Sequence, residues 1–166
     1  EIEFLKGELR KKSEAKYEID NIIGHSDAIR KLKEQIYFAG YANSTVLIEG
    51  ETGTGKELVA HSIHNISSRS IFPFVKVNCS AIPGNLFEAE FFGYEPGSFT
   101  GAIKGGKEGK FQIANKGTIL LDEVNQLDST TQPKLLRVLQ EKEIERVGSS
   151  KSIPIDVRTI AATNVS

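Results

Sequence analysis

The stretch that decides the fold is Gly50-Glu51-Thr52-Gly53-Thr54-Gly55-Lys56, or GETGTGK. It has the GxxxxGK spacing of a phosphate-binding loop, and it lies between an apolar, β-branched run at residues 45–48 and a helical pattern. The glycines let backbone N–H groups turn around a β-phosphate, the helix N-terminus adds partial positive charge, and Lys56 reaches the β/γ oxygens. A plain glycine-rich turn is the alternative, but the position between strand and helix favours a nucleotide site.

The next residue, Glu57, is unusual for such a loop. Phosphate loops normally place Ser or Thr after the lysine, where the hydroxyl holds magnesium. A carboxylate pointing inward would repel phosphate. Either Glu57 turns away from the loop, or the site does not bind nucleotide.

Two acids further along the chain favour the first alternative. The apolar run at residues 119–121 ends in Asp122 and Glu123, an arrangement in which the first acid holds magnesium and the second polarises the water that attacks the γ-phosphate. Asn164, at the end of the last strand pattern, is a candidate to hydrogen-bond that water or the γ-phosphate, and Asn78 to hold Glu123 in an unproductive position. A turn-forming role is the alternative for each asparagine. With a phosphate loop upstream, the two acids predict ATP hydrolysis chemistry.

The rest of the chain alternates strand and helix patterns. We expect strands at residues 45–48, 74–77, 118–124 and 155–162, and helices from an N-cap at Ser26 to a stop at Gly40, after Lys56, at 85–92 and at 130–141. This order predicts an α/β fold in which a parallel sheet is covered by helices on both faces. Residues 1–16, rich in Glu, Lys and Arg with apolar residues at helical spacing, predict a connector helix.

Composition limits the classes of protein. The 166 residues are 39% hydrophobic and 26% charged, with a net charge of -1, which is typical of one soluble domain. The sequence contains no block of like charges that would predict a surface for DNA or an anionic membrane. It also contains no apolar run that approaches the roughly 20 residues needed to cross a bilayer. We expect a cytoplasmic protein without a membrane segment. Because the sequence contains no Met and opens on Glu1, we also expect a piece of a longer protein.

Several residues that often carry chemistry have ordinary interpretations here. The single cysteine, Cys79, excludes an internal disulfide framework and is expected to be buried. His61 and His64 have no further metal-ligand spacing nearby, which favours a surface or core role. Arg146 and Arg158 are either residues of a subunit boundary or solvated strand charges.

Residues 91–102, FFGYEPGSFTGA, pose a separate question. Glycines and a proline indicate a surface turn, yet its tip carries Phe99 and Thr100. Fully burying a Phe stabilises a protein by about 1.5–3 kcal/mol, so an exposed Phe on a loop predicts contact with a partner.

Six segments together resemble the central ATPase domain of sigma-54-dependent transcriptional activators, the NtrC-like branch of the AAA+ ATPases. They are GETGTGKE at 50–57, VNCSAI at 77–82, FFGYEPGSFTGA at 91–102, GTILLDEV at 117–124, KLLRVLQEKEIERVG at 134–148 and VRTIAATN at 157–164. The resemblance implies a P-loop NTPase AAA+ core of three layers (αβα) that binds ATP and Mg2+. It also implies assembly into a ring, usually a hexamer, that remodels sigma-54 RNA polymerase holoenzyme at closed promoters. DNA contact would come from a separate downstream helix-turn-helix domain.

The resemblance also assigns roles to residues. Glu commonly follows the lysine in this family, so Glu57 fits ATP binding; Asp122 and Glu123 match the magnesium and catalytic acids. Asn78 matches the asparagine that switches the catalytic glutamate, Asn164 matches the first sensor, and Ile23 lies in a segment like the family's adenine side. The loop that touches the sigma factor in the family is matched by Gly97, Ser98, Phe99, Thr100, Gly101 and Ala102, where Ser98 replaces the usual Ala. Residues 124–131 resemble a second pore-facing loop.

The family pattern predicts how the chain is divided and how active it is. Residues 1–18 are expected to be a linker helix from an upstream sensory domain, and residues 19–166 a partial ATPase domain. The family's arginine fingers and helical lid lie beyond the matched segments, so we expect residues 1–166 alone to bind nucleotide weakly and to hydrolyse ATP very weakly or not at all.

Two other classes of function compete with a remodelling ATPase. A nucleotide-dependent binding or assembly module would not need the poised acid pair Asp122 and Glu123 beside Asn78. A small-molecule kinase would have no use for the loop at Phe99. Both alternatives are therefore disfavoured.

Overall fold

The computed structural model describes residues 1–5, 15–102 and 104–164. Its central sheet has four parallel strands in the order β1-β8-β5-β2. The strands are β1 (Val46–Glu49), β2 (Phe74–Asn78), β5 (Thr118–Asp122) and β8 (Arg158–Thr163). The predicted parallel sheet is confirmed, and because parallel strands end at the same edge, all four carboxyl ends lie together.

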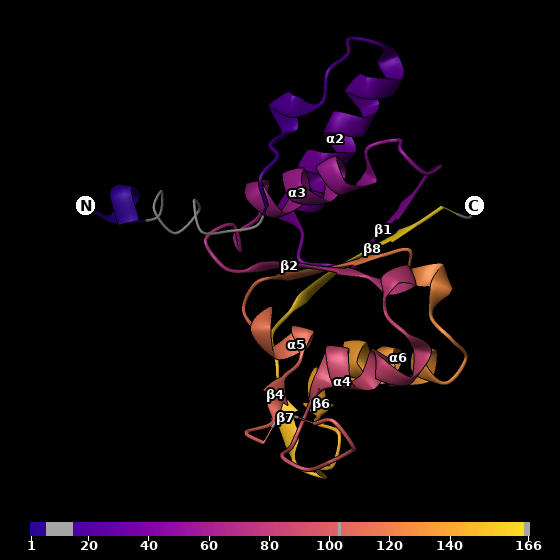
Figure 1. Cartoon of the computed structure of the whole chain (residues 1–166). Coiled ribbons are helices and arrows are strands. Elements are labelled where there is room, and N and C mark those ends of the chain that lie inside the picture. The colour runs from indigo at the N-terminus through magenta and orange to yellow at the C-terminus, as the bar shows by residue number, and fades with distance from the viewer. Residues whose placement is uncertain (6–14, 103, 165–166) are drawn as a thin grey trace.

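Helices cover both faces of this sheet, as Figure 1 shows. On one side lie α2 (Asp27–Tyr41) and α3 (Lys56–Ile66), and on the other α4 (Phe87–Phe92), α5 (Lys110–Ile113) and α6 (Thr131–Glu141). Alternation along β5 separates two hydrophobic cores, since Leu120 packs with the α2–α3 core while Ile119 and Leu121 pack with the other. The predicted three-layer αβα architecture is therefore confirmed.

Two short hairpins complete the end of the fold that lies furthest from α2 in Figure 1. These antiparallel hairpins, absent from the sequence prediction, pair β3 (Gly93–Tyr94) with β4 (Lys107–Glu108) and β6 (Glu143–Glu145) with β7 (Ser152–Pro154). They are joined by backbone hydrogen bonds from Val147 to Gly93 and from Glu95 to Val147. Single 3-10 turns occupy Ile19–Asn21, Cys79–Ala81, Gly84–Leu86 and Val124–Gln126.

Some predicted boundaries are wrong for local physical reasons. The strand predicted over residues 118–124 ends at Asp122, because Glu123 has left-handed backbone angles (φ 53°) that end the strand. The strand predicted over 155–162 begins at Arg158, and the helix predicted from residue 85 begins at Phe87 after a 3-10 turn. The N-cap at Ser26 is confirmed, since its Oγ accepts a hydrogen bond from the Ile29 N–H.

The sequence predicted that the helix stops at Gly40, but α2 continues through Gly40 to Tyr41. Gly40 is buried inside α2, one residue before the end, and a Cβ there would lie 2.5 Å from Cγ2 of Ile66. The absence of a side chain therefore lets α2 approach α3 closely.

The predicted connector helix over residues 1–16 falls largely outside the described residues. At its end, Ala15 and Lys16 are not helical. Instead the Lys16 N–H donates to Nδ1 of His61 (3.0 Å), and Nδ2 of Asn65 donates to the carbonyls of Ala15 (3.0 Å) and Tyr17 (2.8 Å). This segment is thus tied to α3. The division into a linker at 1–18 and a domain at 19–166 stays a prediction.

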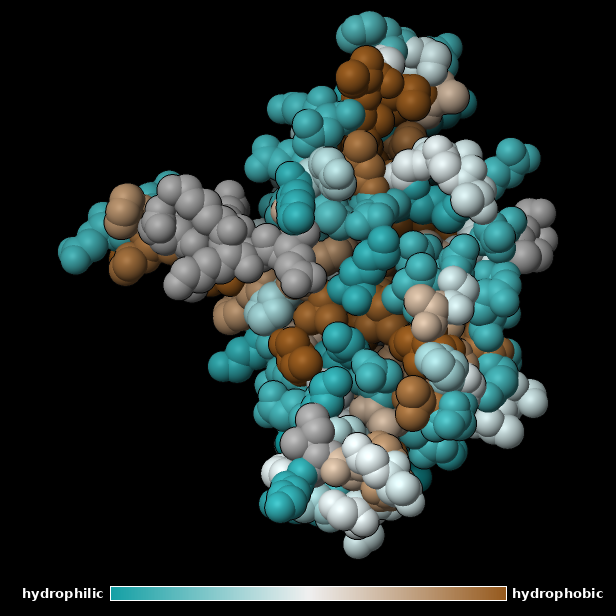
Figure 2. All heavy atoms as spheres, in the orientation of Figure 1, coloured by the Kyte–Doolittle hydropathy of each residue, from teal (hydrophilic) through white to brown (hydrophobic). Residues whose placement is uncertain are grey.

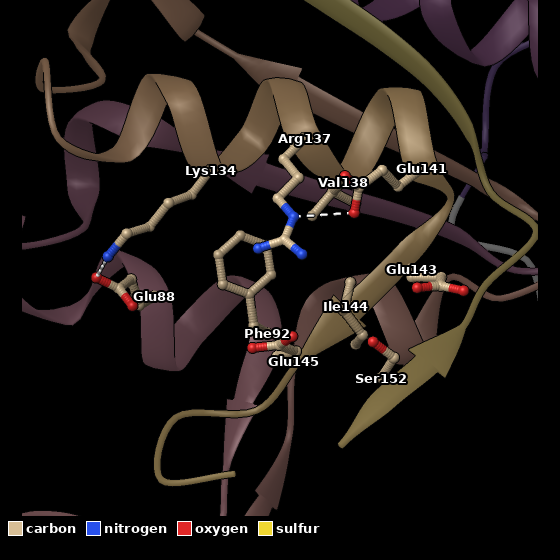
Figure 3. Close-up of a pocket in the computed structure, with 10 residues that line it drawn as sticks. All are labelled: Glu88, Phe92, Lys134, Arg137, Val138, Glu141, Glu143, Ile144, Glu145 and Ser152. Atoms are coloured by element: carbon tan, nitrogen blue, oxygen red, sulfur yellow. Dashed lines mark hydrogen bonds and ion pairs between the residues drawn. The ribbon is translucent and has the colours of Figure 1, made fainter. Parts of the chain in front are cut away.

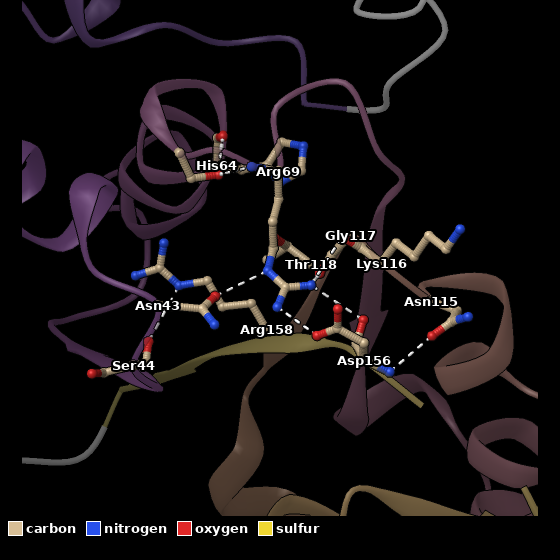
Figure 4. Close-up of polar contacts among 11 residues, drawn as sticks. Asn43, Ser44, His64, Arg69, Asn115, Lys116, Gly117, Thr118, Asp156 and Arg158 are labelled. Carbon is tan, nitrogen blue, oxygen red and sulfur yellow. Dashed lines mark hydrogen bonds and ion pairs between the residues drawn. The ribbon is translucent and has the colours of Figure 1, made fainter. Parts of the chain in front are cut away.

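Two arginines hold the amino ends of the strands, as Figure 4 shows. Arg69 donates to Oδ1 of Asn43 (3.0 Å), to the Lys116 carbonyl (2.9 Å) and to the Asp156 carboxylate (2.6 Å). Arg158 is only 2% exposed, and its guanidinium donates to the carbonyls of Ser44 and Ala39.

Both sequence interpretations of Arg158 are therefore wrong, because burial makes it neither a solvated charge nor a boundary residue. Arg146 donates to Gln112 (3.0 Å) and lies 3.7 Å from Glu95. A boundary role for Arg146 stays a prediction.

The predictions for Cys79 and the two histidines are confirmed. Burial raises the pKa of the Cys79 thiol to about 12, which suits a packing side chain. His61 and His64 are both buried, and Nδ1 of His64 lies 2.8 Å from Oγ1 of Thr118. No helix in the described ranges is long and apolar enough to span a bilayer.

Candidate nucleotide-binding site

The phosphate loop lies between β1 and α3, as predicted. Gly53 (φ 81°) and Gly55 (φ 91°) have left-handed backbone angles, and Gly55 is the N-cap of α3. A Cβ on either glycine would meet no atom within 4 Å, so the space in front of the loop is open. The loop can therefore bring its backbone N–H groups and the α3 N-terminus close to an anion.

Lys56 curls back over this loop. Its Nζ donates to the carbonyls of Gly50 (2.6 Å) and Glu51 (2.7 Å), and Oγ1 of Thr54 donates to the Glu51 carbonyl (2.7 Å). The cation is therefore held at the mouth of the loop by neutral acceptors, which a phosphate would outcompete because of its charge.

One cavity of about 330 Å³ brings eight of the predicted site residues together, whereas Gly50, Glu51, Thr54 and Asn78 are not in its lining. It is lined by Thr52, Gly53, Gly55, Lys56, Glu57, Asp122, Glu123 and Asn164. These residues come from the phosphate loop and from the ends of β5 and β8, far apart in sequence. Ile23, 90% exposed, is not in this lining, and its adenine-side role stays a prediction.

The two acids at the end of β5 differ in conformation. Oδ1 of Asp122 accepts a hydrogen bond from the Glu123 N–H (3.0 Å). Glu123 is one of the described non-glycine residues with positive φ, a conformation that costs on the order of 1–3 kcal/mol. Such strain at a cavity-lining acid is typical of functional sites.

Glu57 turns toward β2. Its Oε2 lies 2.7 Å from Nζ of Lys76, and its Oε1 lies 3.5 Å from Nε2 of His61. The hydrogen bond from Lys76 lowers the pKa of the Glu57 carboxyl. Of the two alternatives that the sequence left open, the structure favours the first, because the carboxylate has a cationic partner away from the loop.

Asparagines surround the acids, including one that sequence reasoning missed. Oδ1 of Asn78, which pairs in register with Asp122, accepts hydrogen bonds from the N–H (3.1 Å) and Oγ (2.8 Å) of Ser80. Oδ1 of Asn164 accepts from Nδ2 of Asn125 (3.2 Å), and Oγ1 of Thr163 donates to Oδ1 of Asn125 (3.1 Å). Asn125 thus connects the turn after Glu123 to the end of β8. The switch and sensor roles stay predictions.

The loop at residues 97–102 bends at Gly97 (φ 71°) and Gly101 (φ 90°). Phe99 is only 38% exposed, because its ring packs edge-on against Tyr94 with centroids 4.9 Å apart. The expectation of an exposed Phe on this loop is confirmed, and Thr100 is exposed as well.

A second cavity, about 270 Å³, lies between α4, α6 and the β6–β7 hairpin, and Figure 3 shows its lining. Its cations are already paired, Lys134 with Glu88 and Arg137 with Glu141 (2.9 Å). It has no glycine loop and no helix N-terminus with open space, so it is the weaker candidate for a nucleotide.

The acids also fit a magnesium ion that a nucleotide brings. Within the described ranges no group of three or more His, Cys, Asp or Glu could hold a metal by itself. Mg2+, however, is usually held by one or two carboxylates together with substrate phosphates and waters. Asp122 supplies one carboxylate to the cavity that the phosphate loop lines.

This fold and site define a P-loop NTPase of the AAA+ class. The family model of the sigma-54 interaction domain matches residues 22–166, and the chain belongs to this family.

Similar proteins agree with this assignment. A signal-transduction and transcriptional-control protein of Clostridium beijerinckii is 57% identical over 150 residues, covering 90% of this chain and 24% of that protein. The DNA-binding transcriptional activator HyfR of Escherichia coli (strain K12) is 54% identical over 146 residues, covering 88% and 22%. The crystal structure of NtrX from Brucella abortus in complex with ADP has a TM-score of 0.79 at 39% identity, covering 87% of this chain and 31% of that one. The chain thus spans about a quarter of the length of these curated relatives.

Proposed function

We propose that this chain is the ATP-binding and hydrolysing domain of a transcriptional regulator that remodels sigma-54 RNA polymerase holoenzyme to open promoters. The observation that carries the proposal is the cavity in which the phosphate loop, Asp122, Glu123 and Asn164 meet. NtrX, a structural neighbour, was solved in complexes with ADP and with ATP, which supports nucleotide binding at this fold.

Each group that lines the site has its own role in ATP hydrolysis. Backbone N–H groups of residues 53–56 and the Lys56 ammonium bind the β- and γ-phosphates. Glu123 orients and polarises the attacking water, and the Asn164 amide hydrogen-bonds the water or the γ-phosphate. Mg2+, held by Asp122 with the phosphates and water, would neutralise negative charge on the phosphates.

The output of the site is the loop at residues 97–102, which contacts sigma-54 through Phe99 and Thr100. We propose that the state of the γ-phosphate, read by Glu123 and relayed through Asn78, biases a two-position element that moves this loop. In the structure the Phe99 ring, 38% exposed, packs on Tyr94. Release of that contact would expose more of the ring to sigma-54.

Assembly completes the proposal. The domain acts as a cytoplasmic ring, by resemblance a hexamer, and contacts DNA only through a separate downstream domain. Residues 1–166 alone hydrolyse ATP very weakly or not at all, because the family's arginine fingers are not among them. A turnover number in the usual enzyme range of about 1–10³ per second from these residues would contradict that statement.

The test uses the full-length protein. Phe99→Ala and Thr100→Ala should abolish binding to sigma-54 holoenzyme while ATP hydrolysis stays near normal. Ile113→Ala, which truncates a 44% exposed side chain on α5, is the matched control and should bind normally. An equal collapse of hydrolysis in the loop variants would make the loop structural.

The ATP hydrolysis assay on the full-length protein also distinguishes a domain that hydrolyses ATP from one that only binds it. Glu123→Gln should leave ATP bound but reduce turnover by at least about 10², as is typical when a general base is removed. Unchanged turnover would favour the alternative of a nucleotide-controlled binding module.

A further inference from the structure

Lys76 is a charged residue at the candidate site that none of the site assignments above includes. It lies in the middle of β2, and its Nζ is 2.7 Å from Oε2 of Glu57 and 3.8 Å from Oδ2 of Asp122. We propose that Lys76 is a positioning residue that holds the Glu57 carboxylate out of the phosphate cradle. This inference rests on the proposed binding of ATP at the loop.

Glu57 needs such a restraint because of its place in the fold. It is the second residue of α3, in the turn whose N–H groups would face the phosphates, and it lines the cavity. A carboxylate free to rotate at this position would lie beside the β-phosphate. Two like charges about 4 Å apart near a protein surface repel strongly enough to weaken binding by more than about tenfold.

The Glu57 carboxylate is fixed from two sides. Lys76 holds Oε2, and on the other oxygen Nε2 of His61 lies 3.5 Å from Oε1. Nδ1 of His61 accepts the Lys16 N–H (3.0 Å), so in the neutral imidazole the proton is on Nε2 and faces Glu57. Lys76 supplies the shorter contact and the full positive charge.

The contacts of Lys76 with Glu57 and with Asp122 differ in length, and the difference leaves Asp122 accessible to a cation. The shorter one goes to Glu57, whereas the Asp122 contact is too long for a hydrogen bond. A cation accompanying the nucleotide could therefore approach Asp122 without breaking the Lys76–Glu57 pair. The Lys76 side chain is 32% exposed. Burial opposes its charge, yet Glu57 and Asp122 outweigh burial and raise the pKa of Lys76, so the pair is ionised at neutral pH.

The experiment is a double-mutant cycle in the full-length protein, with MgADP binding measured by calorimetry. Lys76→Met keeps the aliphatic stem but removes the charge, and we expect the affinity to fall at least about tenfold, which corresponds to about 1.4 kcal/mol. Glu57→Gln alone should bind as well as the wild type or better. The double variant should return to within about threefold of the wild type, because no carboxylate remains to be restrained.

Controls separate this inference from its alternatives. Lys151→Met removes an equal charge from an exposed position and should not change affinity. Thermal unfolding shows whether each variant folds, and Lys76→Gln takes the place of Lys76→Met if the latter does not. Additive effects in the cycle, or no effect of removing the Lys76 charge, would overturn the positioning role.

Failure of the proposed function would look different. It would appear as a wild-type protein that binds MgADP no better than Lys56→Ala, and the inference would fall with it. Normal wild-type binding that the Lys76 variants leave unchanged would overturn the inference alone.

Discussion

At the scale of single residues, Ser98 in the loop at residues 97–102 has a hydroxyl that is buried in a way that the sequence did not predict. Its side chain packs toward Gly148 at the tip of the β6–β7 hairpin, where a Cβ on the glycine would lie 2.8 Å from Cβ of Ser98. The Ser98 Oγ is buried and has no hydrogen-bond partner among the described residues. A buried hydroxyl without a partner costs free energy that a methyl group does not.

We therefore expect Ser98→Ala to raise the free energy of unfolding by up to about 1 kcal/mol, seen as a melting temperature higher by roughly 2–4 °C. Ser62→Ala is the matched control, because the buried Oγ of Ser62 donates to the Leu58 carbonyl (2.8 Å). Its loss should lower stability by about 0.5–1.5 kcal/mol. A lower melting temperature for Ser98→Ala would mean that the hydroxyl has a partner in solution.

The candidate site was largely predictable from the sequence because most of its residues belong to short contiguous motifs. The phosphate loop needs glycines next to a lysine, and Asp122 and Glu123 follow an apolar strand, so local patterns identify both. Lys76 and Asn125 were missed because their contacts depend on which strands are neighbours. Without the strand order, no pattern shows that residue 76 lies beside residue 57.

At the scale of elements, the contact between α2 and α3 depends on the missing side chain of Gly40. A Cβ at this position would lie 2.5 Å from Cγ2 and 2.8 Å from Cβ of Ile66. Alanine favours a helix by about 1 kcal/mol over glycine, but overpacking a tight contact costs about 1–3 kcal/mol. We expect Gly40→Ala to be destabilising by up to about 2 kcal/mol in urea unfolding.

Two further variants check that the cause is steric. Gln35→Ala, at an exposed position of the same helix, should change stability by less than about 0.5 kcal/mol. The double variant Gly40→Ala with Ile66→Ala should cost less than the sum of the single changes, because truncation of Ile66 removes the clashing atom. Additive costs would place the effect of Gly40 elsewhere.

Helices and strands that pack an apolar face against the rest of the fold were predictable from the sequence, whereas the short hairpin strands were not. Short apolar runs, helical spacing of apolar residues and the phosphate loop predicted four strands and the main helices, because each of these elements packs an apolar face against the rest of the fold. The hairpins at β3–β4 and β6–β7 have strands of two or three residues, and they are held by pairing with segments distant in the sequence. Gly40 was misinterpreted for the same reason, since only the position of Ile66 shows why a glycine is needed inside α2.

At the scale of the whole molecule, His64 links the layer of α2 and α3 to the central sheet. It is fully buried on α3, and its Nδ1 lies 2.8 Å from Oγ1 of Thr118 on β5. Burial lowers the pKa of His64 from 6.5 to about 4. Between these two values the unfolded chain binds a proton that the folded chain does not. Stability is therefore highest above pH 6.5 and falls as the pH decreases toward 4.

The predicted size of this effect is up to roughly 3 kcal/mol, since each unit of pKa difference is worth about 1.4 kcal/mol. Urea unfolding between pH 7 and 5 should show about 2 kcal/mol of it, above the range in which carboxylates of the unfolded chain, such as Glu57 with its ordinary pKa of 4.5, take up most of their protons. His64→Gln should lower stability at pH 7 but flatten the decrease below pH 6.5, leaving the smaller part due to His61, whose pKa burial also lowers. His25→Gln, at an exposed position, should keep the wild-type slope. An unchanged slope in His64→Gln would show that another group controls the acid sensitivity of the fold.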